Sequence, residues 1–180
     1  MNVHDLAIRA LGADDWPAFR ALRLAAIADA PLAVWPTHDE EAGRSPEEVR
    51  ARIACTAHQA VLGVFAGTDL VAIAGVRREP LAQVAHKALL WGVFVHPDWR
   101  RHGLARRLMQ AACAHARAAG ALQVQLSVNA GNARARALYA TLGFVEYGRE
   151  PRAMRVGAAF YDEVLMVLRL DGPAGIPTLR

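Results

Sequence analysis

Cysteine and lysine are nearly absent from this sequence. Cys55 and Cys113 are the only cysteines, and they lie far apart, outside any spacing that holds a metal. Two isolated thiols are typical of a cytoplasmic protein without a disulfide framework. Lys87 is the single lysine, so the formal net charge of +4 comes almost entirely from arginine. The arginines are scattered, which argues against a nucleic-acid-binding tail, but an anionic cofactor, an acidic partner or a compositional bias all fit the charge.

Long apolar segments are also lacking. The longest, such as residues 70–76, fall far short of the roughly 20 residues that cross a membrane. Residues 1–10 contain charged side chains and no apolar segment of the kind found in signal peptides. We therefore expect a cytoplasmic protein with no membrane partner. The pattern Gly-x-Gly-x-x-Gly is absent too, which disfavours a dinucleotide-binding oxidoreductase.

The chain does contain enough apolar material for a packed core. Its 180 residues are 54% hydrophobic, which fits one domain over residues 1–170 followed by a loose tail at 171–180. Apolar alternation predicts strands, whereas helical spacing with capping residues predicts helices. The predicted strands are 6–9, 59–65, 70–77, 89–95, 122–128, 144–147 and 160–170; the predicted helices are 16–27, 45–56, 103–119 and 132–142. Residues 31–44, with two prolines and an acidic cluster, are predicted to be a loop or a broken helix. The fold class is therefore α/β, with a mixed sheet flanked by about four helices.

The most informative stretch is Arg100-Arg101-His102-Gly103-Leu104-Ala105. It follows the apolar strand 89–95 and opens the predicted helix 103–119. A helix start leaves backbone N–H groups unpaired, and the aligned peptide dipoles make that end partly positive. Gly103 lets the backbone come close to a ligand where a side chain would block it. The stretch therefore predicts a phosphate-binding turn.

A second block lies downstream, where Asn129-Ala130-Gly131-Asn132 leads into a helix that carries Tyr139 and ends at Leu142-Gly143-Phe144. Together the two blocks resemble the acetyl-coenzyme A-binding core of the GNAT superfamily of N-acetyltransferases. The phosphate motif of that family is filled here by Arg100, Gly103 and Ala105. The predicted order of strands and helices over roughly residues 5–170 is also similar to that of the GNAT fold, whose sheet is mostly antiparallel.

The resemblance implies acetyl-coenzyme A as co-substrate and no metal. Backbone N–H groups of the turn would bind the pyrophosphate, the edge of strand 89–95 would pair with the pantetheine arm, and an N–H near Val95 would polarise the thioester carbonyl. Asn132 and Tyr139 are two helical turns apart, so they lie on nearly the same face. The cofactor-binding residues implied in this way are Val93, Phe94, Val95, Arg100, Arg101, His102, Gly103, Leu104, Ala105, Arg106, Asn132, Ala135 and Tyr139.

The chemistry implied is direct transfer of an acetyl group to a primary amine in a ternary complex. Tyr139 is the candidate general acid, because a phenol stays protonated at neutral pH and can donate to a departing thiolate. Relatives that acetylate ribosomal protein N-termini carry a glutamate where Ser127 stands, and histone acetyltransferases carry one near Leu89. The general base is therefore left open among Glu40, Glu41, Glu79, His96 and an ordered water.

The acceptor is also left open between a small-molecule amine and a peptide amine. The segment 31–44 holds Trp35 and an acidic cluster that suits a cationic amine, although the same residues fit a solvated turn. The segment between the last two strands holds Arg149, Arg152 and Arg155, which suit a carboxylate or phosphate. A zwitterion such as an amino acid fits both. The alternative function is a non-catalytic acyl-coenzyme A-binding sensor or regulatory module. A homodimer is possible by analogy with relatives, and no nucleic-acid partner is expected.

Overall fold

The computed structural model describes residues 6–172, and its centre is one seven-stranded sheet in the order β1-β2-β3-β4-β5-β7-β6. The strands are β1 (Ala7–Ala10), β2 (Gln59–Ala66), β3 (Asp69–Arg78), β4 (Lys87–Val95), β5 (Gln123–Asn129), β6 (Val145–Val156) and β7 (Ala159–Arg169). The helices are η2 (Ala13–Asp15), α1 (Trp16–Asp29), α2 (His38–Ala42), α3 (Pro46–Ile53), η3 (Pro97–Trp99), α4 (Leu104–Ala118) and α5 (Ala133–Thr141). Only the β4–β5 pair is parallel among these strands, so the expected mixed α/β fold is confirmed.

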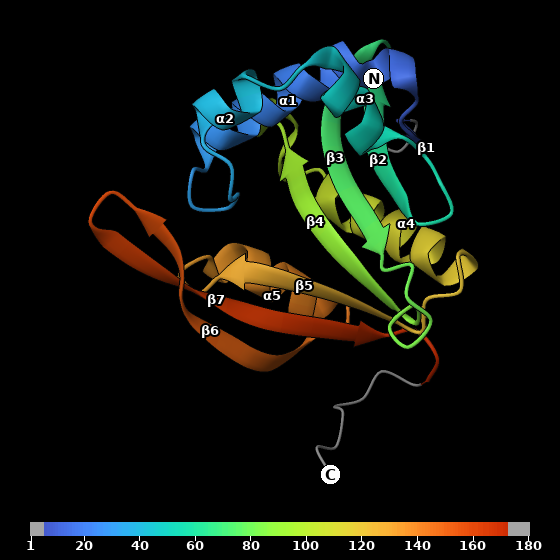
Figure 1. Cartoon of the computed structure of the whole chain (residues 1–180), viewed down its shortest axis with the longest axis vertical. Helices are drawn as coiled ribbons and strands as arrows, with labels where there is room; N and C mark the ends of the chain where they lie inside the picture. The colour runs from blue at the N-terminus through green and yellow to red at the C-terminus, as the bar shows by residue number, and fades with distance from the viewer. Residues whose placement is uncertain (1–5, 173–180) are drawn as a thin grey trace.

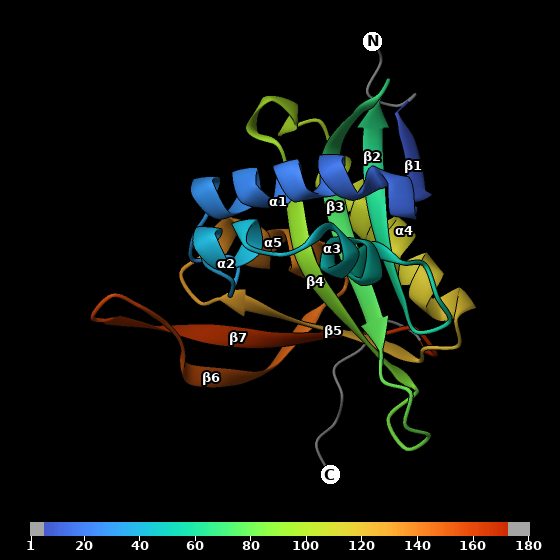
Figure 2. The ribbon, with the colours of Figure 1, turned by 45° about the horizontal axis from the view of Figure 1, so that its top comes forward.

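Helices cover both faces of the sheet (Figures 1 and 2). On one face, α1 and α3 pack against β2 and β3 through a core that includes Phe19, Ile53 and Ile73. On the other face, α4 contributes buried side chains at intervals of four residues, which form one stripe along the helix. These are Leu104, Leu108, Ala112 and Ala116, and their cluster continues into α5 through Tyr139. The two cores lie on opposite faces of the sheet, and both include residues of β4.

The sheet is split between β4 and β5. These two strands pair only through residues 87–89 and 123–125 and then diverge, as Figure 1 shows. A bulge lies farther along β4, since Phe94 pairs with Ile73 whereas Trp91 pairs with Gly75. Gly92 lies in the bulge with φ +63°, a left-handed conformation that glycine adopts without steric cost. The split leaves one edge of β4 open just before the predicted phosphate-binding turn.

The segment 31–44 contains a short helix, α2, which raises the count of α-helices in residues 6–172 to five instead of about four. Thr37 is its N-cap and Glu40 completes a capping box, with the Thr37 N–H donating to Glu40 Oε2 at 2.7 Å. The next helix, α3, ends at Ile53, so the predicted boundary at residue 56 was three residues too long.

The predicted strand 144–147 was too short. β6 continues to Val156, so Arg149, Arg152 and Arg155 lie on a strand and the prediction that they lie in a loop was wrong. β6 pairs with β7 over its length, with irregularities between Glu146 and Gly148 and between Glu150 and Met154. Because β6 is an edge strand, these irregularities accommodate Gly148 and Pro151 within it.

The two ends of the chain are described only in part. Residues 1–5 and 173–180, which include most of the predicted tail, lie outside the described range. Within that range, Arg169 donates from Nε and Nη2 to the carboxylate of Asp171, at 3.1 Å each. No helix between residues 6 and 172 is long and apolar enough to cross a membrane.

Candidate active site

The predicted phosphate-binding turn connects β4 to α4 through η3. Arg101 and Gly103 both adopt left-handed backbone conformations, with φ +69° and +75°. Gly103 is the N-cap of α4 and provides no side-chain cap, and the first hydrogen bond into the helix runs from the Arg107 N–H to the Gly103 carbonyl at 3.1 Å. The N–H groups of residues 104–106 therefore have no intrahelical acceptor. A Cβ at Gly103 would meet nothing within 4 Å, so the turn is open to a ligand.

Two arginines of the turn are held by side-chain hydrogen bonds. Arg100 donates from Nε to the Val95 carbonyl at 3.0 Å, and its guanidinium binds the carboxylate of Asp29 at the end of α1. Arg106 donates to Thr141 Oγ1 at the end of α5, at 2.8 Å. These bonds fix the turn between the ends of two helices, which keeps its open N–H groups in one place.

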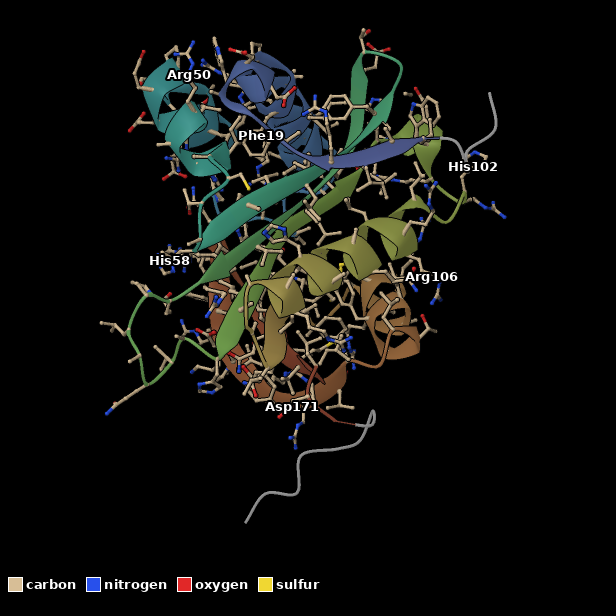
Figure 3. The ribbon with its side chains drawn as sticks, turned by 90° about the vertical axis from the view of Figure 1, so that its right-hand side faces the viewer. Phe19, Arg50, His58, His102, Arg106 and Asp171 are labelled. Carbon is tan, nitrogen blue, oxygen red and sulfur yellow. The ribbon has the colours of Figure 1, made fainter. Side chains whose placement is uncertain are left out.

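A cavity of about 430 Å³, called here the turn cavity, lies beside this turn, between β4 and α5. Every cofactor-binding residue implied by the sequence except His102 lines it. Those residues are Val93, Phe94, Val95, Arg100, Arg101, Gly103, Leu104, Ala105, Arg106, Asn132, Ala135 and Tyr139. His102 is exposed at the edge of the molecule, away from α5 (Figure 3). The structure thus gathers two sequence blocks, about 30 residues apart, around one space.

Tyr139 lies on the wall of the turn cavity that α5 provides. Asn132 starts this helix as its N-cap, and its side-chain oxygen accepts the Ala135 N–H at 3.1 Å. Tyr139 follows two turns later, is 9% exposed and packs 6.0 Å from the ring of Phe144. Burial raises the pKa of Tyr139 to about 12. The phenol is therefore a proton donor over the whole physiological pH range.

A second cavity of about 150 Å³, called here the charged cavity, adjoins the first. Gly92 lines the charged cavity and its neighbour Val93 lines the turn cavity, whereas Ala33 lines both. The two cavities therefore meet at the bulge of β4. Arg23, Val34, Trp35, Pro36, Arg52, Leu89, Leu90, Trp91, Ser127 and Glu163 complete the walls of the charged cavity.

Two ionisable side chains in this cavity are almost completely buried. Arg23 is 2% exposed and Glu163 is 6% exposed. The Trp35 indole donates to Glu163 Oε1 at 3.0 Å, whereas Glu163 Oε2 and the Nε and Nη1 atoms of Arg23 have no hydrogen-bond partner. Burial is the main cause that lowers the pKa of Arg23 to about 10, and the positive charge of Arg52 acts in the same direction. Arg23 still carries its charge at neutral pH.

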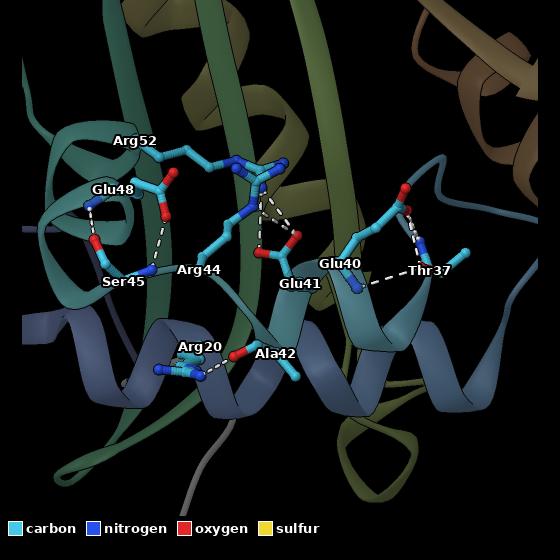
Figure 4. Close-up of polar contacts among 9 residues, drawn as sticks. All are labelled: Arg20, Thr37, Glu40, Glu41, Ala42, Arg44, Ser45, Glu48 and Arg52. Carbon is cyan, nitrogen blue, oxygen red and sulfur yellow. Dashed lines mark hydrogen bonds and ion pairs between the residues drawn. The ribbon is translucent and has the colours of Figure 1, made fainter.

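A buried carboxylate, that of Glu41, binds Arg52, one of the residues that line the charged cavity (Figure 4). It is 1% exposed, and its two oxygens accept from Arg52 Nη1 at 3.1 and 3.0 Å. Arg44 forms an ion pair with it at 3.6 Å. Glu41 therefore connects α2 to α3 and orients Arg52, whose guanidinium also stacks 4.7 Å from the ring of Trp91.

None of the four side chains proposed as a general base lines either cavity. Glu40 caps α2, Glu41 is held by arginines, Glu79 is exposed beyond β3, and His96 accepts a backbone N–H in the turn before η3. Sequence reasoning missed Glu163 because it lies within an apolar strand pattern, where no local signal marks it. In residues 6–172, no three His, Cys, Asp or Glu side chains gather to hold a metal ion.

The split mixed sheet and the open helix N-terminus beside it define a class of α/β proteins that bind a phosphate-bearing cofactor between diverging strands. The sequence model of the acetyltransferase (GNAT) family matches residues 24–144, and the chain belongs to this family. The resemblance inferred from the two motifs is thereby confirmed, as is the family's cofactor, acetyl-coenzyme A.

Similar proteins agree with this assignment. The [ribosomal protein bS18]-alanine N-acetyltransferase of Salmonella typhimurium is 33% identical over 88 residues, which are 49% of this chain and 60% of that protein. The match thus spans less than two thirds of that relative. A GNAT acetyltransferase of Streptococcus pneumoniae superposes with a TM-score of 0.82 at 23% identity, covering 92% of this chain and 100% of the other. The yncA protein of Salmonella typhimurium, solved with its cofactor acetyl-coenzyme A, gives 0.79 at 21% identity, over 97% and 99%. These two likenesses establish the fold.

Proposed function

We propose that this protein transfers an acetyl group from acetyl-coenzyme A to a primary amine, a small molecule or a peptide, by direct transfer in a ternary complex. The observation that carries the proposal is the meeting of two cavities at the bulge of β4, one beside an open helix N-terminus and one containing buried charges. Two ligands bound in them approach each other at Gly92 and Val93. Residues 1–170 are proposed to form one domain for this reaction.

The turn cavity suits the cofactor. Backbone N–H groups of residues 101–106 would hold the pyrophosphate, as helix N-termini do. The edge of β4 at residues 93–95 faces the split, where β5 no longer pairs with it, and would hold the pantetheine arm as a strand does. The bound cofactor supplies the acetyl thioester.

Tyr139 and Glu163 handle the protons in this proposal. Glu163 accepts the proton of the ammonium group through its unpartnered Oε2, which leaves a neutral amine. The amine nitrogen attacks the thioester carbonyl, the C–N bond forms and the C–S bond breaks. The departing thiolate takes the phenolic proton of Tyr139, and the resulting phenolate takes the second proton that the nitrogen loses as it becomes an amide. Glu163 pairs with Asn129 on the neighbouring strand β5 and lies diagonally across from Ser127. Ser127 is the position at which acetyltransferases of ribosomal protein N-termini carry a glutamate. In this protein a carboxylate therefore lies one strand away from that position.

The test is to incubate the purified protein with acetyl-coenzyme A and a mixed panel of amines, and to follow release of free thiol. Thiol release that depends on an amine supports the proposal. Tight binding of acetyl-coenzyme A without thiol release for any amine contradicts it, and supports the non-catalytic acyl-coenzyme A-binding alternative.

Substitution of Gly103 by alanine is expected to weaken acetyl-coenzyme A binding by roughly tenfold or more. The methyl group lies where phosphates approach the N–H groups, and the loss of one or two charge-assisted hydrogen bonds has that magnitude. Calorimetric titration measures the dissociation constant. Gly67→Ala is the matched control, because Gly67 also has a left-handed φ (+62°) and open space around it, but lies in the β2–β3 turn. Both variants should lose about 1–2 kcal/mol of stability. Equal cofactor affinity in the two variants would exclude Gly103 from the site.

Substitution of Glu163 by glutamine is expected to lower kcat by about 100-fold, a typical contribution of a positioned base. The amide keeps the shape of the side chain, so the dissociation constant of acetyl-coenzyme A should change little. Glu150→Gln is the control, because Glu150 pairs with Glu163 across β6 and β7 but is exposed. If both variants keep the wild-type kcat in steady-state assays, Glu163 is not the base.

A further inference from the structure

The charged cavity contains a buried cation, Arg23, two of whose nitrogens the protein leaves without a hydrogen-bond partner. Three guanidinium groups, those of Arg23, Arg44 and Arg52, lie around the single carboxylate of Glu41. Arg44 and Arg52 pair with Glu41 directly, whereas two nitrogens of Arg23 have no hydrogen-bond partner. Buried charges are normally paired and hydrogen-bonded, because their removal from water is costly. An anion that enters the cavity would supply the missing acceptors.

The position of Arg23 places this cation next to the reaction. Its Nη1 lies 3.1 Å from the point where a Cβ on Gly92 would stand. Gly92 belongs to the bulge at which the two cavities meet, so the absence of a side chain there makes room for the guanidinium. A carboxylate oxygen that enters from this side can accept a charge-assisted hydrogen bond from Nη1.

The opposite charge is provided by strand β7, whereas Arg23 lies on helix α1. Glu163 on β7 lines the same cavity, and its Oε2 is free to accept from an amine. Trp35 fixes the other carboxylate oxygen, and Trp91 adds an aromatic wall. The cavity of about 150 Å³ is thus lined by one carboxylate, that of Glu163, and by two guanidinium groups, of which that of Arg52 is already paired with Glu41.

We propose that the acceptor is an amine that carries a carboxylate, as a free α-amino acid does, with its carboxylate on Arg23 and its amino group on Glu163. This inference rests on the proposed acetyltransferase function and names the chemical class of its second substrate. It differs from acetylation of a protein N-terminus, whose α-amine is followed by a neutral amide. Such an amine would leave Arg23 unpaired in the complex.

The first experiment uses the wild-type protein with acetyl-coenzyme A and compares each free L-α-amino acid with its carboxamide. Glycyl-glycine is added to distinguish a free amino acid from a peptide carboxylate, and ethylamine represents an amine without one. We expect kcat/KM for the best free amino acid to exceed that of its carboxamide by at least about 100-fold, since a site built to bond a polar group rejects an analogue that lacks it.

The second experiment compares Arg23→Gln with wild type on the best amino acid and on its carboxamide. We expect kcat/KM for the amino acid to fall to within about tenfold of the carboxamide value, which itself changes little. Arg23→Lys should restore part of the preference, because it restores the charge without the planar fork. Arg50→Gln is the charge-matched control, since Arg50 is exposed on α3, outside the cavity (Figure 3). Its preference should match that of wild type.

The outcomes separate the two proposals. Thiol release with carboxamides or ethylamine as fast as with amino acids overturns the acceptor assignment but leaves the acetyltransferase function standing. No thiol release with any amine overturns both. Preference for glycyl-glycine over all free amino acids overturns the free amino acid in favour of a peptide carboxylate. The wild-type comparison decides these outcomes even if Arg23→Gln does not fold.

Discussion

Replacement of Tyr139 by phenylalanine should lower kcat by about 10²- to 10⁴-fold, the usual contribution of a positioned proton donor. The ring still fills its place against Phe144, so acetyl-coenzyme A should bind nearly as tightly as to wild type. Steady-state kinetics and calorimetric titration together separate the two effects. Tyr147→Phe is the matched control, because Tyr147 is 45% exposed on β6 and lines neither cavity. An unchanged kcat in Tyr139→Phe would remove the phenol from the mechanism.

The pH dependence follows from the burial of the same phenol, which raises the pKa of Tyr139 to about 12. An ordinary phenol would be half ionised near pH 10 and would no longer donate a proton, whereas Tyr139 should remain protonated there. The kcat of the wild type should therefore show no loss from this group up to about pH 10. Folding stability should decrease between about pH 10 and 12, because the unfolded phenol releases its proton first.

Replacement of Glu41 by alanine should destabilise the fold by about 3–5 kcal/mol, the cost of breaking a buried ion pair by removing one partner. Glu41 is 1% exposed, and its removal leaves Arg44 and Arg52 without the carboxylate that pairs with both, and Arg23 without the negative charge beside it. Chemical denaturation monitored by circular dichroism measures the loss of stability.

Asp39→Ala provides the comparison for Glu41. Asp39 lies on the same short helix, but its side chain is fully exposed, so its removal should change stability by no more than about 0.5 kcal/mol. If both variants unfold at the same denaturant concentration, the arginine cluster is stabilised by something other than Glu41.

The phosphate-binding turn could be predicted from the sequence because its signals are contiguous. A strand, a basic glycine-containing turn and a helix start follow one another within about 20 residues, and the local backbone dictates what each does. Helical spacing likewise predicts that Asn132, Ala135 and Tyr139 lie on one face of their helix. Nearly all residues inferred in this way line one cavity. Their roles in binding and catalysis stay predictions until the variants are measured.

The charged cavity could not be predicted in the same way. Arg23 follows Leu22 on a helix whose apolar pattern gives no reason to place an arginine inside, and Glu163 lies on a strand more than 130 residues later. Only the sheet order, with β7 next to β5 and α1 across β3 and β4, brings them to one space. Long-range pairing of this kind leaves no trace in local periodicity.

Helix α1 has a consequence for how the binding of one ligand affects the affinity for the other. Its middle carries Arg23 in the charged cavity, and its last residue, Asp29, holds Arg100 of the phosphate-binding turn. One helix is therefore shared by both binding sites. If one ligand fixes the helix in place, the other meets a helix already ordered, and the two affinities rise by the same factor whichever ligand comes first. The order of addition can thus change the route to the ternary complex, whereas the coupling between the two ligands is a single equilibrium quantity.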